Sequence, residues 1–235
     1  MYLNDINIAA INGLSKDQLV EILQEARSLG SEFNADRHIK WEDDTRSISQ
    51  VINPFVPVSA KFKDTSYGLS SVGYDLRLGE EIMWLKNSIF KGSPDSNIIS
   101  GLEPVYVDGA VKSDPNTMEK ATIAADTPCR MAPSSFLLAH TYEYIKMPNN
   151  LVGFVMDKSS LARKGLSLQN TVIEPGWEGM ITLEIFNMSP HYIDLYPGMG
   201  IAQLMFSYIV PPLTAYNDRI VKGKYQGQTG VQPAL

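Results

Sequence analysis

The amino-acid sequence predicts a mainly β protein with a barrel or jelly-roll core over residues 51–210. Three observations support this fold class. From Val51 onward, short runs alternate between apolar and polar residues; turn-forming residues interrupt them at short intervals; and a helical period is confined to the N-terminal region. Many short strands with frequent turns are typical of all-β barrels and jelly rolls. We therefore divide the chain into an N-terminal helical extension and linker (1–50), the β core (51–210) and a C-terminal flap (211–235).

The N-terminal extension contains one clear helix signal. Ser15 and Gln18 have the spacing of a capping box, in which the hydroxyl and the amide close the first helical turn. Gly30 is a suitable helix end. Between them, apolar residues recur at helical spacing: Leu19, Ile22, Leu23, Ala26 and Leu29. Residues 34–50 are charged and unpatterned, which favours a linker, and we assign the extension no catalytic role.

The predicted strands of the core follow the alternating runs. They include Tyr74–Leu78, Glu81–Leu85, Phe136–His140, Leu151–Met156, Met180–Asn187 and Gly200–Tyr208. Turn sequences lie at residues 147–150, 174–176 and 196–198. The tail from Pro211 is rich in Pro, Gly, Gln and Lys and has no core pattern, so we expect an exposed arm.

The composition excludes several classes of function. With 235 residues, 44% of them hydrophobic, the chain can bury a sizeable core. Its net charge of −6 argues against a polymeric nucleic acid as partner, because such binders need a basic face, although a few Lys and Arg suffice for one nucleotide. No apolar run approaches the roughly 20 residues of a membrane span. The N-terminus lacks a signal-peptide pattern and Cys129 is the single cysteine, so we expect a cytoplasmic protein without membrane association.

The metal-ligating residues are too few for a zinc enzyme. The chain has three widely separated histidines: His38, His140 and His191. A catalytic zinc site usually needs three protein ligands. Zinc-dependent nucleobase deaminases also need the sequence P-C-x-x-C, but Cys129 is not followed by a second cysteine. Any deamination by this chain must therefore run without zinc.

A phosphate-binding interpretation fits residues 157–165. Three cations and two adjacent hydroxyls follow an apolar strand and precede a glycine, and phosphate oxygens favour such a mixture of charge and short donors. A solvated turn with incidental charges is the alternative.

The strand at residues 180–186 carries a carboxylate. Its side chains alternate, so Ile181, Leu183 and Ile185 share one face, and Glu184 lies on the other face with Thr182 and Phe186. Glu184 is therefore either a solvated edge residue or an acid in a cleft. In a cleft, partial burial would raise the pKa of the carboxyl and make it a usable proton shuttle. The preceding segment, residues 170–179, has the pattern of a hairpin with a Pro-Gly turn.

The tail offers cations, aromatic rings and amides at Tyr216–Asn217 and at residues 222–228. These residues suit a flap that orders over an anionic ligand. A disordered terminus is the alternative.

Taken together, these segments resemble the dCTP deaminase branch of the trimeric dUTPase superfamily, over roughly residues 52–228. Five motifs in the same order carry the resemblance. Residues 71–79 are similar to the family's SYDLRLG strand, residues 136–148 to FxLAxTxExxxxP, 159–163 to SSLAR, 197–204 to PGMxIAQL, and 224–228 to KYQGQ.

The resemblance implies a dUTPase-like distorted jelly-roll or β-barrel fold, a homotrimer with active sites at subunit interfaces, and a pyrimidine deoxyribonucleoside triphosphate bound with Mg²⁺ and without zinc. It assigns to Glu184 the activation of the water that attacks C4 of cytosine. It gives Ser159 and Arg163 a role in polarising the catalytic centre. The full set of expected substrate-binding residues is Lys158, Ser159, Ser160, Leu161, Ala162, Arg163, Glu174, Thr182, Leu183, Glu184, Gln203, Tyr216, Lys224 and Gln228.

Departures from both the deaminase and the dUTPase patterns leave the reaction open. The loop from Gly165 to Glu174 is two residues shorter than in the deaminases and fits the corresponding dUTPase segment, whose acidic residue orients a water toward the α-phosphate; here that residue is Glu174. Trp177 replaces the tyrosine of the dUTPase base-stacking hairpin. The leading hypothesis is deamination of dCTP to dUTP and ammonia. The alternatives are a dUTP diphosphatase or bifunctional enzyme, and a non-catalytic nucleotide-sensing or interaction module.

Overall fold

The computed structural model describes residues 2–30, 51–85, 98–99, 118–220 and 223–233. Its helices are α1 (Asp5–Ile11), α2 (Lys16–Leu29), α4 (Ser159–Ala162) and the 3₁₀ turn η4 (Tyr216–Asp218). Its strands are β1 (Ile52–Asn53), β2 (Ser59–Phe62), β3 (Thr65–Leu69), β4 (Tyr74–Leu85), β5 (Ile98–Ile99), β6 (Met118–Thr122), β7 (Cys129–Met131), β8 (Phe136–Lys146), β9 (Leu151–Asp157), β10 (Leu166–Leu168), β11 (Val172–Ile173), β12 (Glu178–Asn187), β13 (Ile193–Leu195) and β14 (Gly200–Tyr208). The expected mainly β fold class is confirmed.

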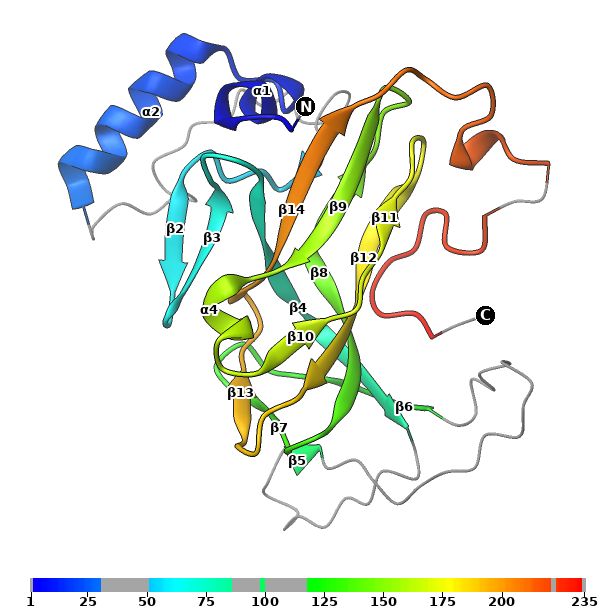
Figure 1. Ribbon diagram of the computed structural model, residues 1–235. Helices are drawn as coiled ribbons and strands as arrows, with labels where there is room; N and C mark the ends of the chain where they lie inside the picture. The colour runs from blue at the N-terminus through cyan, green and yellow to red at the C-terminus, as the bar shows by residue number, and fades with distance from the viewer. Residues whose placement is uncertain (1, 31–50, 86–97, 100–117, 221–222, 234–235) are drawn as a thin grey trace.

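In the described part of the chain, eleven strands form one curled antiparallel sheet (Figure 1). Its main path runs β10-β12-β8-β4-β14-β9-β11, with β1, β2, β3 and β6 attached along it. A second, three-stranded sheet has the order β13-β7-β5. The long central strands β4, β8, β12 and β14 bring segments from the whole length of the core side by side, and this arrangement creates the space for a site.

The core lies inside the curl of the sheet because the strands alternate. Along β12 and most of β14, every second side chain is buried and the others are half-exposed. Tyr74, Leu76 and Leu78 of β4 are fully buried against them. An ion pair lies within this apolar interior: Arg77 Nε is 2.7 Å from the fully buried carboxylate of Glu143. Pairing is required there, since an isolated buried charge is costly.

The two N-terminal helices pack on one side of the barrel (Figure 1). The capping box that we predicted at Ser15 is confirmed, and Gly30 is the C-cap of α2. The sequence analysis missed α1, which is only seven residues long and is capped by Asn4. Asn12 ties this pair of helices to the core, because its side chain accepts a hydrogen bond from Ile52 N at 2.7 Å.

The structure differs from the sequence predictions in β4, in β8, which continues beyond His140 to Lys146, and in the C-terminal arm. The two runs predicted in residues 74–85 form the single strand β4, whose pairing with β8 shifts register between Leu78 and Ile82. The C-terminal arm is exposed at residues 211–214, as expected, but beyond that it docks onto the barrel, and Val231 is only 2% exposed. Among the described residues, no helix is both long and apolar enough to cross a membrane.

Candidate active site

A pocket of about 940 Å³ opens between β12, β8, β11 and the C-terminal arm. Its volume lies in the range typical of small-molecule sites. Five of the predicted site residues line it: Glu174, Thr182, Glu184, Tyr216 and Gln228. They come from the Pro-Gly turn before β12, from β12 itself and from the arm, so long-range folding assembles this part of the site.

Glu184 lies on the half-exposed face of β12, opposite Leu183 and Ile185, and it lines the pocket. The alternation of the strand predicted this face but left open whether it borders a cleft or solvent. Its cross-strand neighbour is Leu138, and Phe136 and Met118 line the same wall. The side chain is half-buried, and this burial raises the pKa of the Glu184 carboxyl above its ordinary value. A carboxyl of raised pKa beside open space can accept and return a proton more readily than an ordinary, fully hydrated glutamate.

Asn170 is a pocket residue that the sequence analysis did not select. Its side-chain amide bonds to the backbone of β12 on both sides of Leu183. Nδ2 donates to Thr182 O at 2.7 Å, and Oδ1 accepts from Glu184 N at 3.3 Å. An asparagine at the start of a hairpin is too common a turn residue to mark it in the sequence.

Aromatic side chains form the rim of the pocket. Trp177, Tyr216 and Tyr225 all line it, and Trp177 Nε1 donates to Tyr225 O at 3.1 Å. Two of these rings belong to the C-terminal arm. Flat aromatic faces favour stacking with a planar ligand such as a nucleobase.

The arm adds backbone pairing to β12. Gly227 N donates to Glu178 O at 2.8 Å, and Met180 N donates to Gln228 O at 2.9 Å. The Gln228 side chain donates to Met180 O and, at 3.3 Å, to Thr182 Oγ1. Its Oε1 is buried and has no hydrogen-bond partner among the described residues. The arm therefore carries a buried acceptor at the pocket wall.

Glu174 is engaged by the arm. Arg219 Nη2 lies 2.6 and 2.7 Å from its two carboxylate oxygens, and the same guanidinium stacks on Tyr216 with 4.8 Å between Cζ and the ring centroid. Arg219 was not selected from the sequence, because nothing local links it to a glutamate 45 positions earlier. In this conformation the pair fastens the arm to the turn before β12.

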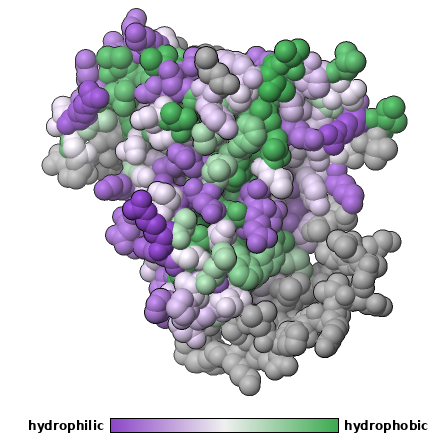
Figure 2. Space-filling view, in the orientation of Figure 1, coloured by the Kyte–Doolittle hydropathy of each residue, from purple (hydrophilic) through white to green (hydrophobic). Residues whose placement is uncertain are grey.

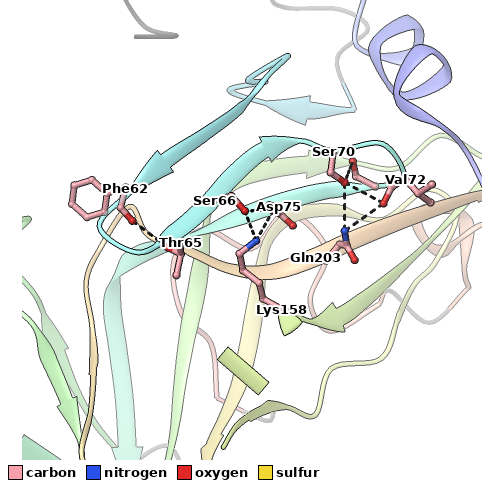
Figure 3. Close-up of polar contacts among 9 residues, drawn as sticks. Phe62, Thr65, Ser66, Ser70, Val72, Asp75, Lys158 and Gln203 are labelled. Atoms are coloured by element: carbon pink, nitrogen blue, oxygen red, sulfur yellow. Dashed lines mark hydrogen bonds and ion pairs between the residues drawn. The ribbon is translucent and has the colours of Figure 1, made fainter. Parts of the chain in front are cut away.

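The predicted phosphate loop lies apart from this pocket, since none of residues 158–163 lines it. Lys158 is buried, and its Nζ lies 2.5 Å from Asp75 Oδ2 and 2.9 Å from Ser66 Oγ (Figure 3). The ammonium thus has a carboxylate partner in this structure, and the expected phosphate contact of Lys158 stays a prediction. The hydroxyls of Ser159 and Ser160 and the guanidinium of Arg163 are on exposed residues of α4 and its C-cap.

The remaining predicted residues are also outside the pocket. Leu161 and Leu183 are buried in the core, so only their backbone groups can reach a ligand. Ala162 and Lys224 are exposed. Gln203 projects from the outer face of β14, where its amide nitrogen lies 3.4 Å from Ser70 Oγ and from Val72 O (Figure 3).

The pocket combines a half-buried carboxyl, an aromatic rim and an arm that packs along one wall. Across the described ranges, no group of three or more His, Cys, Asp or Glu is placed to hold a metal ion. Glu184 lines the pocket and burial raises its pKa, so it is well suited to acid–base chemistry.

The sequence model of a family described as dCTP deaminase-like matches residues 45–209. The dCTP deaminase of Herpetosiphon aurantiacus is 39% identical over 200 residues, which cover 85% of this chain and 96% of that protein. The dCTP deaminase of Roseiflexus castenholzii is 37% identical over 185 residues, covering 78% and 89%. Among solved structures, 2′-deoxycytidine 5′-triphosphate deaminase from Agrobacterium tumefaciens aligns over 91% of this chain and 49% of its own, with 16% identity and a TM-score of 0.47.

The chain belongs to the dCTP deaminase-like family. It is an enzyme of pyrimidine nucleotide metabolism.

Proposed function

We propose that this enzyme converts dCTP and water to dUTP and ammonia. The proposal rests on Glu184. This residue lies at the wall of a ligand-sized pocket, and burial raises the pKa of its carboxyl. Two curated relatives of more than a third identity are named dCTP deaminases.

In the proposed reaction Glu184 transfers two protons. Its carboxylate takes a proton from water while the water oxygen attacks C4 of cytosine, and it passes that proton to N3. It then takes the proton of the new hydroxyl and delivers it to the amino group. Ammonia leaves, C4 becomes a carbonyl, and the glutamate returns to its starting ionisation state.

The arm residues cover the base in this proposal. Tyr216 and Tyr225 stack against the planar ring, and the unpartnered Gln228 Oε1 is available to accept a hydrogen bond from the ligand. Closure of such a cover excludes water other than the reacting one. Glu174 and Arg219 hold the arm in place.

The triphosphate, carried with its Mg²⁺, requires cations that this pocket does not itself supply, since no Lys or Arg is among the described residues that line it. We assign the phosphates to Ser159, Ser160 and Arg163 of a neighbouring subunit. These exposed donors combine short hydroxyls with a planar guanidinium, which phosphates favour. Lys158 anchors the start of this loop to β4 through its ion pair with Asp75.

An outer apolar face supports association into a homotrimer. It consists of Phe154, Met156, Val172 and Met205, which neighbour one another across β14, β9 and β11. Met156 and Val172 are each nearly half exposed, and Figure 2 shows hydrophobic side chains gathered over β9 and β11. Val172 also lines the pocket, so a subunit docked on this face would reach the site. Head-to-tail contacts generate a closed ring when the rotation between neighbouring subunits closes, as in a trimer.

Product analysis tests the proposed reaction. Purified enzyme is incubated with Mg²⁺ and either dCTP or dUTP, and nucleotides, ammonia and pyrophosphate are quantified by chromatography and coupled assays. Ammonia and dUTP from dCTP are expected. Pyrophosphate and dUMP from dUTP, lost in Glu174→Gln and kept in Glu184→Gln, would instead establish the diphosphatase, which the presence of Glu174 in the same pocket makes the second candidate.

A further inference from the structure

Strand β10 leaves its partner β12 at the position where Glu184 projects into the pocket. The two strands pair from Leu166↔Asn187 to Leu168↔Ile185. One more backbone bond follows, from Gln169 N to Glu184 O at 3.0 Å. Beyond it the chain of β10 turns away, which opens the pocket but removes the ladder partners of the next backbone groups of β12.

The side chain of Asn170 replaces those partners. In a continued ladder, Glu184 N would donate to the carbonyl of residue 169, and Thr182 O would accept from the amide of residue 171. Instead, Asn170 Oδ1 accepts from Glu184 N at 3.3 Å and Nδ2 donates to Thr182 O at 2.7 Å. A carboxamide has both an acceptor and a donor, so it satisfies two backbone groups as a peptide unit would.

We propose that Asn170 is a positioning residue for Glu184: its side-chain amide ends the β10–β12 ladder and holds the backbone of residues 182–184, so that the Glu184 carboxyl stays in the pocket. This inference rests on the proposed role of Glu184 in deamination. Acid–base catalysis requires the carboxyl within hydrogen-bond reach of the water and of N3, and small displacements are costly.

Asparagine is specific for this task. Alanine leaves a donor and an acceptor of β12 without partners. Aspartate keeps an acceptor for Glu184 N, but it cannot donate to Thr182 O, and it adds a negative charge beside the Glu184 carboxyl. A second negative charge in the same pocket raises the pKa of the Glu184 carboxyl. The two substitutions therefore differ in their effect on the pH dependence of the reaction.

The experiment compares Asn170→Ala and Asn170→Asp with the matched control Gln169→Ala, in the full-length enzyme. Gln169 is adjacent and exposed, and it contacts Glu184 through its backbone only. We expect kcat for dCTP to fall about ten- to a hundredfold in both Asn170 variants, with KM changed much less, because ligand contacts remain. The acid limb of the kcat profile should move to higher pH in Asn170→Asp and not in Asn170→Ala.

Hydrogen exchange gives a readout that does not depend on activity. The Glu184 amide should exchange faster in Asn170→Ala, which removes its acceptor, than in Gln169→Ala or in Asn170→Asp, which keeps one. Melting temperatures confirm that all three proteins fold. Wild-type kcat in Asn170→Ala, or an unshifted acid limb in Asn170→Asp, would overturn the positioning role. Failure of the proposed function is distinguishable, because it would appear as undiminished ammonia release from Glu184→Gln with Asn170 intact.

Discussion

At the scale of a single residue, the burial of Glu184 favours acid–base chemistry but lowers the stability of the folded protein. Its carboxylate loses part of its hydration against Leu138 and Phe136, and this burial raises its pKa. The folded state therefore binds the proton of Glu184 more tightly than the unfolded chain does. Consequently, the free energy of unfolding decreases as the pH rises from the ordinary pKa of a glutamate to the raised one.

The substitution Glu184→Gln should stabilise the protein and inactivate it. The amide keeps the shape of the side chain and has no charge to bury, so the melting temperature near pH 8 should exceed that of the wild type. This advantage should vanish as the pH is lowered toward about 4, where the wild-type carboxyl is protonated in both states. Deamination should fall by at least ~10²–10⁴-fold, the contribution of general acid–base catalysis. Thermal scans across pH together with initial rates test both effects, and retained ammonia release would contradict the mechanism.

Lys158 and Arg163 lie close in sequence but have different surroundings, so we expect their alanine substitutions to affect stability and activity differently. Lys158→Ala leaves Asp75 buried without its cation, and we expect a loss of about 3–5 kcal/mol in the free energy of unfolding, measured in urea. Arg163 is exposed, so Arg163→Ala should change stability by less than about 0.5 kcal/mol. It should nevertheless lower kcat/KM for dCTP by roughly ten- to a hundredfold, through the loss of a charge-assisted phosphate contact. Equal stability of the two variants would contradict the structural role of Lys158.

At the scale of elements, a glycine in the Pro-Gly turn before β12 allows the C-terminal arm to pack closely against that turn. Gly176 has φ +79°, and a Cβ there would overlap the side chain of Asn217 and lie 2.9 Å from Ala215 Cβ. Its position therefore permits both the left-handed backbone and the close approach of the arm. Gly198 stands in a second Pro-Gly turn with φ +84°, but open space surrounds it.

These two turns give a matched test of the arm. Gly176→Ala and Gly198→Ala should each cost about 1–2 kcal/mol in stability, because both place a side chain at positive φ. Only Gly176→Ala should displace the arm, and we expect its KM for dCTP to rise while the KM of Gly198→Ala stays at the wild-type value. Urea unfolding measures the backbone strain in both variants, and steady-state kinetics measure the effect of displacing the arm. An equal KM in the two variants would show that the arm does not cover the ligand.

At the scale of the whole molecule, the carboxyl and the phosphate donors lie in different places on one chain. Glu184 lines the pocket, whereas Arg163 follows α4 outside it. In the proposed trimer, each site combines the pocket of one subunit with the loop of the next, so two separately inactive variants can complement each other.

Mixing Glu184→Gln with Arg163→Ala should therefore restore deamination. After the two variants are unfolded and refolded together in equal amounts, about a quarter of the sites contain an intact Glu184 and an intact Arg163 from different chains, by random assortment. The control is each variant refolded alone, with light scattering to verify the assembly state. No recovery in a mixed oligomer would mean that both residues act within one chain.

Local patterns sufficed for much of the fold. β14 was predicted with its observed bounds and β12 within two residues, because period-two alternation is encoded by adjacent positions. The same holds for the capping box of α2. The short helix α1 escaped because seven residues contain too few turns to establish a helical period. β4 was divided because its register shift interrupts the alternation.

For the site, the sequence by itself determined which face of β12 carries Glu184 and that a Pro-Gly turn precedes it. Only the tertiary structure decided what each group meets. Lys158 pairs with Asp75 from 83 positions away, and Arg219 pairs with Glu174 across 45. The role of Asn170 beside Glu184 depends on the place where β10 leaves β12, which is a tertiary feature. The physical reason is that alternation and capping depend on neighbouring residues, whereas ion pairs and ladder ends depend on how the sheet curls, and the curl brings distant segments together.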